Sequence, residues 1–104
     1  CTPCIEELPD IVKIGQKYKH RGLNLVGVRL DLEGPDTIQP LVDEHNVNFP
    51  VYWLGEKAIE TFDIRGIPLL IFVQEGSIVK RLKGRRPKSQ LEHHIKAFLD
   101  PPPP

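Results

Sequence analysis

Two cysteines open the chain as Cys1-Thr2-Pro3-Cys4, three positions apart and followed by a helix-like run. Side chains at this spacing on a helix lie about 5–6 Å apart at Cβ. A disulfide needs roughly 3.5–4.5 Å, so a small adjustment closes the bond. Unpaired N–H groups and the macrodipole at a helix start also stabilise a thiolate. The pattern therefore predicts a redox pair, with Cys1 as the attacking thiol and Cys4 as the resolving thiol.

The same two cysteines have two less reactive interpretations. A zinc site needs four ligands, and no other cysteine exists to supply them. His93 and His94 could complete it only by pointing to the same side, which adjacent residues of a helix do not do. A purely structural disulfide is the second interpretation, although a loop this short removes little chain entropy. The redox interpretation is favoured, and neither a metal nor an organic cofactor is expected.

The composition indicates one soluble domain. The chain has 104 residues, of which 39% are hydrophobic and 27% are charged, and its 14 basic and 14 acidic residues cancel. Such a balance argues against nucleic acid as a partner, and no apolar run approaches the ~20 residues of a membrane span. Because the chain begins on a cysteine with no visible signal sequence, we expect a trimmed N-terminus. Any membrane anchor would then lie upstream.

The order of the elements indicates an α/β fold. Gly-rich and Pro-rich turns separate apolar runs of strand length from segments of helical period. We expect a first helix with a kink or restart at Pro9 and a stop at Gly22, where glycine can adopt a positive φ. We expect a buried strand at 69–73, a tight turn at 74–77 and a final helix opened by the capping box Ser89-x-x-Glu92. We also expect Phe49 and Trp53 in the core. The expected helices are 3–20, 37–46, 56–62 and 89–99, the expected strands are 23–30, 48–53, 69–73 and 78–82, and the domain is 1–100 with a proline tail at 101–104.

Six segments in order resemble the thioredoxin superfamily, in its TlpA/ResA/DsbE-like branch of membrane-anchored or exported thiol-disulfide oxidoreductases. Each matches a short motif of that branch, and together they extend over most of the chain. They are Cys1-Thr2-Pro3-Cys4, Glu7-Leu8-Pro9, residues 18–28, Val47-Asn48-Phe49-Pro50-Val51, Phe62-Asp63-Ile64-Arg65-Gly66-Ile67-Pro68 and Glu75-Gly76-Ser77-Ile78-Val79.

The resemblance implies a mixed sheet flanked by helices and an exchange of disulfides with a protein substrate. In this branch the substrate is often apocytochrome c or another exported protein, and the location is periplasmic or otherwise extracytoplasmic. The family also implies that the Ile67–Pro68 peptide bond is cis, against a base rate of about 5–6%. Pro68 would then lie against the cysteines, and Glu7 would tune their ionisation. Thr2, Pro3 and Ile67 would contact an extended partner peptide.

The chain departs from the family at its start. In relatives a strand ending in tryptophan precedes the first cysteine and lies in the interior of the sheet; here it is absent, so we expect an incomplete sheet with a gap between strands 23–30 and 69–73. A redox-inactive peptide-binding module and a peroxiredoxin-like thiol peroxidase remain as alternatives. The peroxidase would need a threonine three residues before its reactive cysteine, and before Cys4 that position is Cys1. The basic run Lys83, Arg85, Arg86 and Lys88 is interpreted as a solvated loop, with a docking surface for an acidic partner as the alternative.

Overall fold

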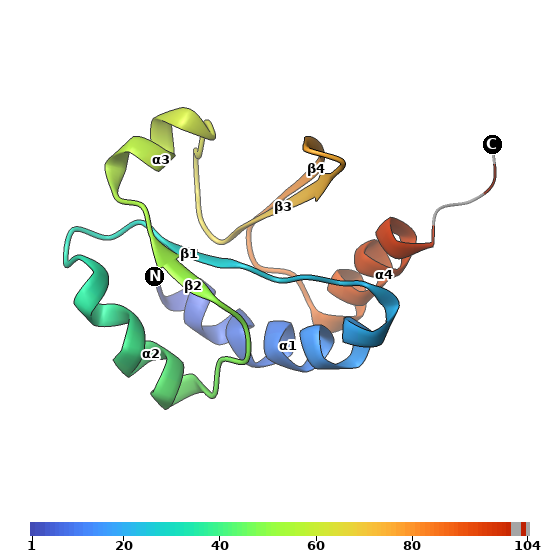
Figure 1. Cartoon of the computed structure of the whole chain (residues 1–104), viewed down its shortest axis with the longest axis horizontal. Coiled ribbons are helices and arrows are strands. Elements are labelled where there is room, and N and C mark those ends of the chain that lie inside the picture. Colours follow the sequence, from blue (N-terminus) through green and yellow to red (C-terminus); the bar gives the residue numbers. More distant parts are fainter. Residues whose placement is uncertain (101–102, 104) are drawn as a thin grey trace.

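The computed structural model of the chain describes residues 1–100 and Pro103. The proline tail expected at 101–104 lies outside the described residues except for Pro103. The α-helices and strands follow one another in the order that the sequence predicts (Figure 1). The elements, in chain order, are α1 Thr2–Tyr18, η1 Lys19–Arg21, β1 Gly27–Arg29, η2 Pro35–Thr37, α2 Ile38–His45, β2 Val51–Trp53, α3 Glu56–Thr61, β3 Leu69–Gln74, β4 Ser77–Lys83 and α4 Lys88–Leu99.

Helix α1 is the longest element and continues through Pro9, so the restart expected there does not occur. Pro9 lacks the N–H that would donate a hydrogen bond to the carbonyl four residues earlier. Pro9 lies on the exposed side of the helix, where water can donate to that carbonyl instead. The helix tightens into η1 and ends at Gly22, whose φ of 91° is left-handed. This stop is where the sequence predicts it.

The four strands form one parallel and one antiparallel pair. Strands β1 and β2 run parallel, with Gly27 opposite Val51. Strands β3 and β4 form a hairpin with Gln74 opposite Ser77. Its two-residue turn, Glu75-Gly76, has φ values of 53° and 80°, as a type I′ turn requires. In the described part of the chain the two pairs share no strand hydrogen bonds (Figure 1).

Strand β1 is shorter than the predicted strand 23–30. Only the residues that lie opposite β2 are in a strand, because β2 itself has three residues and no described strand pairs with the other edge of β1. The apolar stretch before it still contributes to packing, since Leu23 is buried. The short β1 thus agrees with the expected gap between the first strand and β3.

The core lies between α1, the hairpin and α4. Helix α4 contributes Leu91 and Ile95 to the core, and α1 contributes Ile14, which is 1% exposed. Strand β3 was expected to be fully buried but is covered mainly on one face, so Phe72 is buried and Val73 is 54% exposed. The buried cluster consists of Ile14, Tyr18, Leu23, Phe72, Leu82, Leu91 and Ile95.

Two further local predictions are wrong. Helix α4 has Pro87 as its N-cap and makes no side-chain cap hydrogen bond, so Ser89 lies inside the first turn. Glu92 instead accepts a hydrogen bond from Lys17 of α1 at 3.0 Å. Trp53 lies at the surface, 36% exposed, because its indole N–H donates to the carbonyl of Asp31 at 2.7 Å. Phe49 is half-buried.

Candidate functional site

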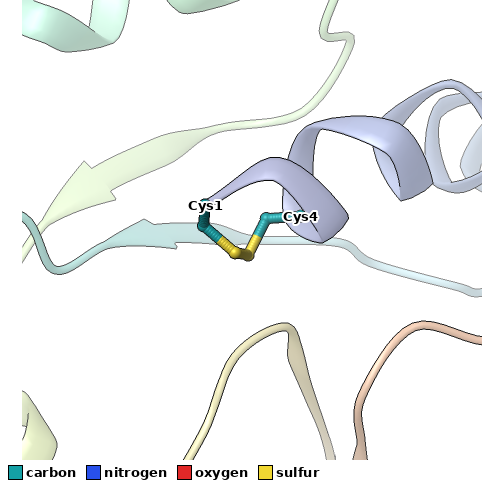
Figure 2. The surroundings of a disulfide bond; sticks show 2 residues. All are labelled: Cys1 and Cys4. Carbon is teal, nitrogen blue, oxygen red and sulfur yellow. A yellow bond between two sulfur atoms is a disulfide. The ribbon is translucent and has the colours of Figure 1, made fainter.

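Cys1 and Cys4 form a disulfide across the first turn of α1, with Cα atoms 5.3 Å apart (Figure 2). That separation lies in the ordinary range for disulfides. Cys1 is the N-cap of the helix, and its carbonyl accepts the N–H of Ile5 at 3.2 Å. The sequence predicts this pairing and this position, because the helical run that follows places the second cysteine one turn inside.

The two sulfur-bearing residues differ in exposure. Cys1 is exposed and Cys4 is half-buried, while Thr2 and Pro3 between them are exposed. A partner protein can therefore approach Cys1 and the two intervening residues from solvent, whereas Cys4 is shielded. In exchange chemistry the accessible thiol attacks and the shielded thiol resolves. The attacking role of Cys1 and the resolving role of Cys4 stay predictions, and this asymmetry favours them.

Glu7 is the buried polar residue of the site, at 3% exposure. One of its carboxylate oxygens accepts a hydrogen bond from the backbone N–H of Arg86 at 2.9 Å. Its neighbour Glu6 is exposed and pairs with the guanidinium of Arg85. The basic loop 84–87 is therefore docked on α1 and is not merely solvated, which corrects the sequence interpretation. A run of basic residues did signal the loop, but nothing local indicated its acidic partners 79 positions away.

The Ile67–Pro68 peptide bond is cis, as the resemblance predicts. Pro68 is half-buried, and its carbonyl accepts the N–H of Gly84 at 2.9 Å. The loop 84–87 thus contacts both site residues. The N–H of Gly84 donates to Pro68, and the N–H of Arg86, two residues later, donates to Glu7. Ile67 is 48% exposed and leaves its side chain to solvent. In Figure 2 the segment that leads into β3 passes opposite the sulfur atoms.

The carboxyl ends of β1 and β2 lie beside the start of α1 (Figure 1). There Arg29 forms an ion pair with Asp31 and donates to the carbonyl of Thr37 at 3.2 Å. Trp53 adds its hydrogen bond to Asp31, so the loop after β1 is tied to the end of β2.

Metal-binding and membrane-spanning features are not found in the described residues. No three His, Cys, Asp or Glu side chains of residues 1–100 gather as metal ligands would. No helix in the same part of the chain is long and apolar enough to cross a bilayer.

Comparison with known proteins identifies relatives of one kind, although no family model matches the chain. It is 31% identical over 97 residues to the thiol-disulfide oxidoreductase ResA of Halalkalibacterium halodurans, covering 91% of this chain and 54% of that protein. It is 29% identical over 98 residues to ResA of Bacillus anthracis, covering 92% and 56%. The chain thus spans about half the length of the curated relatives it matches.

Solved structures agree with these relatives. A candidate thiol:disulfide interchange protein DsbE from Chlorobium tepidum superposes with a TM-score of 0.84 at 26% identity, over 95% of this chain and 72% of that one. A candidate thioredoxin from Neisseria meningitidis superposes with a TM-score of 0.80 over 94% and 67%, and at 22% identity it supports the fold alone. The resemblance inferred from the sequence is confirmed: this chain is a thioredoxin-like domain, similar to the ResA and DsbE thiol-disulfide oxidoreductases.

Proposed function

We propose that this chain exchanges disulfides with the thiols of another protein through Cys1 and Cys4. The observation that carries the proposal is the disulfide at the start of α1, with one cysteine exposed and the other shielded. The ResA relatives, which are named as thiol-disulfide oxidoreductases, support the same activity. The reaction belongs to the cysteines and requires no metal or organic cofactor.

The exchange proceeds in two balanced steps. In the reduced protein the Cys1 thiolate attacks one sulfur of a substrate disulfide, forming a mixed disulfide and releasing a substrate thiolate that takes up a proton. The Cys4 thiol then loses its proton and attacks Cys1, which releases the second substrate thiol. Two electrons and two protons pass to the substrate, and the Cys1–Cys4 disulfide of the structure is the product. The reverse sequence oxidises a substrate dithiol.

Four neighbouring residues support these steps. Glu7, buried one turn beyond Cys4, would exchange a proton with the resolving thiol, and its hydrogen bond from Arg86 fixes its position. Thr2, Pro3 and the exposed Ile67 would contact the substrate chain next to the sulfurs.

Pro68 would exclude water and shape the surface where an extended peptide binds. Its half-buried position on the segment leading into β3 and its hydrogen bond from Gly84 support this role.

The substrate and the compartment are further parts of this proposal. Protein disulfides and dithiols are the substrate class, and apocytochrome c or another exported protein is the specific substrate that we propose. An extracytoplasmic location, the periplasm in a bacterium with two membranes, is part of the same proposal. An oxidising compartment is where such disulfides persist.

Trapping a mixed disulfide tests the activity. Cys4→Ser leaves the attacking thiol but removes the resolving one. Cys1 is therefore expected to remain linked to a protein that contains disulfides, such as native insulin. The adduct should appear on a non-reducing gel and disappear with dithiothreitol. Cys1→Ser is the matched control and should trap nothing. If Cys4→Ser forms no adduct while peptide binding persists, the chain is a peptide-binding module and the proposal fails.

A further inference from the structure

Lys80 and His94 meet on the side of α4 that faces the hairpin, and Arg86 lies in the loop that leads into the same helix. The ammonium of Lys80 in β4 lies 2.6 Å from Nδ1 of His94 in α4. The guanidinium Nε of Arg86, from the loop before α4, is buried and has no hydrogen-bond partner. An ammonium can only donate, so Nδ1 of His94 is the acceptor and the proton of the neutral ring is on Nε2.

The strand register and the helical spacing explain why Lys80 and His94 meet. Lys80 lies directly opposite Phe72 in the hairpin, so both side chains leave the same face. Phe72 packs edge-on against Phe98 of α4, with ring centroids 5.1 Å apart, so this face is the one that α4 covers. His94 lies one turn before Phe98 on the same side of the helix.

The side chains of Lys80 and Arg86 form no ion pair in the described residues, and the carboxylate of Glu7 accepts only the backbone N–H of Arg86. In residues 1–100 the lysines and arginines that form ion pairs are Lys17, Arg21, Arg29, Arg65 and Arg85, and neither Lys80 nor Arg86 is among them. Burial, and then the positive charges of Lys80, Arg86 and His93, lower the pKa of His94 below its ordinary value. His93 is the other titratable group facing His94, with ring centroids 5.6 Å apart. The unpaired guanidinium N–H of Arg86 and the like charges at this partly buried place favour an anionic ligand.

We propose that Lys80, Arg86 and His94 form a binding site for a small oxyanion of the sulfate or phosphate class. An ammonium, a planar guanidinium and an imidazole N–H, supplied by a strand, a loop and a helix, suit the several acceptor oxygens of such an ion. The site lies outside the redox centre but adjoins it, since the backbone N–H of the same Arg86 holds Glu7. Binding at this site does not depend on the proposed exchange activity.

A change in the pKa of His94 when the anion binds tests the site. Sulfate is the probe because its charge stays constant while histidines titrate. NMR would follow the ring protons of the four histidines with sodium sulfate and with sodium chloride at equal ionic strength. Sulfate is expected to raise the pKa of His94, because a bound anion favours the imidazolium, and to bind more tightly as the pH falls. Exposed His20, on η1, is the internal reference and should not respond.

Two variants separate a built site from general attraction. Lys80→Gln removes a charge-assisted donor and should weaken sulfate binding about tenfold. Lys83→Gln removes the same charge from an exposed position of β4 on the opposite face and should leave binding unchanged. Arg86→Gln keeps the N–H that holds Glu7 and should weaken sulfate as Lys80→Gln does. Equal shifts at all histidines, or equal loss in Lys80→Gln and Lys83→Gln, would overturn the proposal.

Discussion

The two strand pairs of this fold are stabilised very differently. The hairpin β3–β4 lies against α1 and α4, and these elements hold six of the seven buried residues of the core cluster, all but Leu23. The parallel pair β1–β2 and helix α2 contain no fully buried side chain. Apolar side chains of that region, such as Val28 and Tyr52, are about half exposed. We call the first the packed region and the second the open region.

The difference shows which region supplies stability and which region has an unpaired strand edge. Burial of apolar surface is the dominant favourable term in folding, so the packed region supplies most of it. In the open region the free edge of β1 faces away from β2, and no described strand pairs with it or with the free edge of β3. The regions meet at the start of α1, which carries the disulfide and lies beside the ends of β1 and β2 (Figure 1).

The largest effect is expected from filling the position between β1 and β3. An extension of about 20–40 residues upstream of Cys1, long enough for one strand and its lead-in, would pair with both free edges. Each N–H or C=O group that it satisfies is worth ~1–3 kcal/mol, so several approach the ~5–15 kcal/mol stability of a typical domain. Thermal melts and size-exclusion of both lengths measure this. Equal melting with a monomeric 104-residue chain would show that the sheet is complete without that strand.

A matched pair of leucine truncations compares the regions directly. Leu91→Ala in α4 removes a side chain that is 0% exposed, and the lost burial plus the cavity should cost about 2–5 kcal/mol of unfolding free energy. Leu54→Ala, after β2, truncates a side chain that is 45% exposed and should cost about 0.5 kcal/mol. Urea unfolding of both variants gives the two values. Similar costs would mean that the open region is packed as tightly as the other.

Glu7→Gln tests whether the buried carboxylate near the disulfide, where the two regions meet, exchanges a proton with the cysteines. Glutamine keeps an oxygen for the Arg86 N–H, so the unfolding free energy should change by less than about 1 kcal/mol, but glutamine cannot exchange a proton with a thiol. The pH profile of iodoacetamide alkylation of the reduced cysteines should therefore change. Glu6→Gln, its exposed neighbour paired with Arg85, is the control and should leave the profile unchanged. An identical profile for both variants and the parent would make Glu7 a structural residue only.

The sequence predicts what depends on neighbouring residues and misses what depends on distant ones. The cysteine spacing, the stop at Gly22 and the Glu75-Gly76 turn are local and are confirmed. The prediction of a capping box at Ser89 is wrong, because Glu92 accepts a hydrogen bond from Lys17, 75 positions away.

The remaining misses have the same cause. The docking of the Arg86 loop on Glu7 joins residues 79 positions apart, and the short β1 follows from a strand pairing. Tertiary contacts of this kind override local propensity and cannot be recognised from one segment.

The smallest effect is expected from the ion pair that joins the helices of the packed region. Lys17 of α1 donates to Glu92 of α4 at 3.0 Å. The hydrogen bond to Lys17 lowers the pKa of Glu92 below its ordinary value of 4.5, and the hydrogen bond to Glu92 raises the pKa of Lys17 above 10.5. The pair therefore contributes fully between pH 4.5 and 10.5. Its contribution is lost as the pH falls through the lowered value for Glu92 or rises through the raised value for Lys17.

Glu92→Gln isolates that contribution. The variant should melt slightly below the parent at neutral pH, and the difference should vanish in acid, where Glu92 of the parent is protonated too. Molar salt should also shrink the difference, because the pair is partly exposed and is screened. Calorimetry across pH at low and high salt measures both trends. Gln90→Glu adds an exposed charge on the same helix turn and should not reproduce the pH dependence. A difference that persists unchanged in acid would assign the effect to helix propensity at position 92, and the two helices would then be held by their apolar contacts alone.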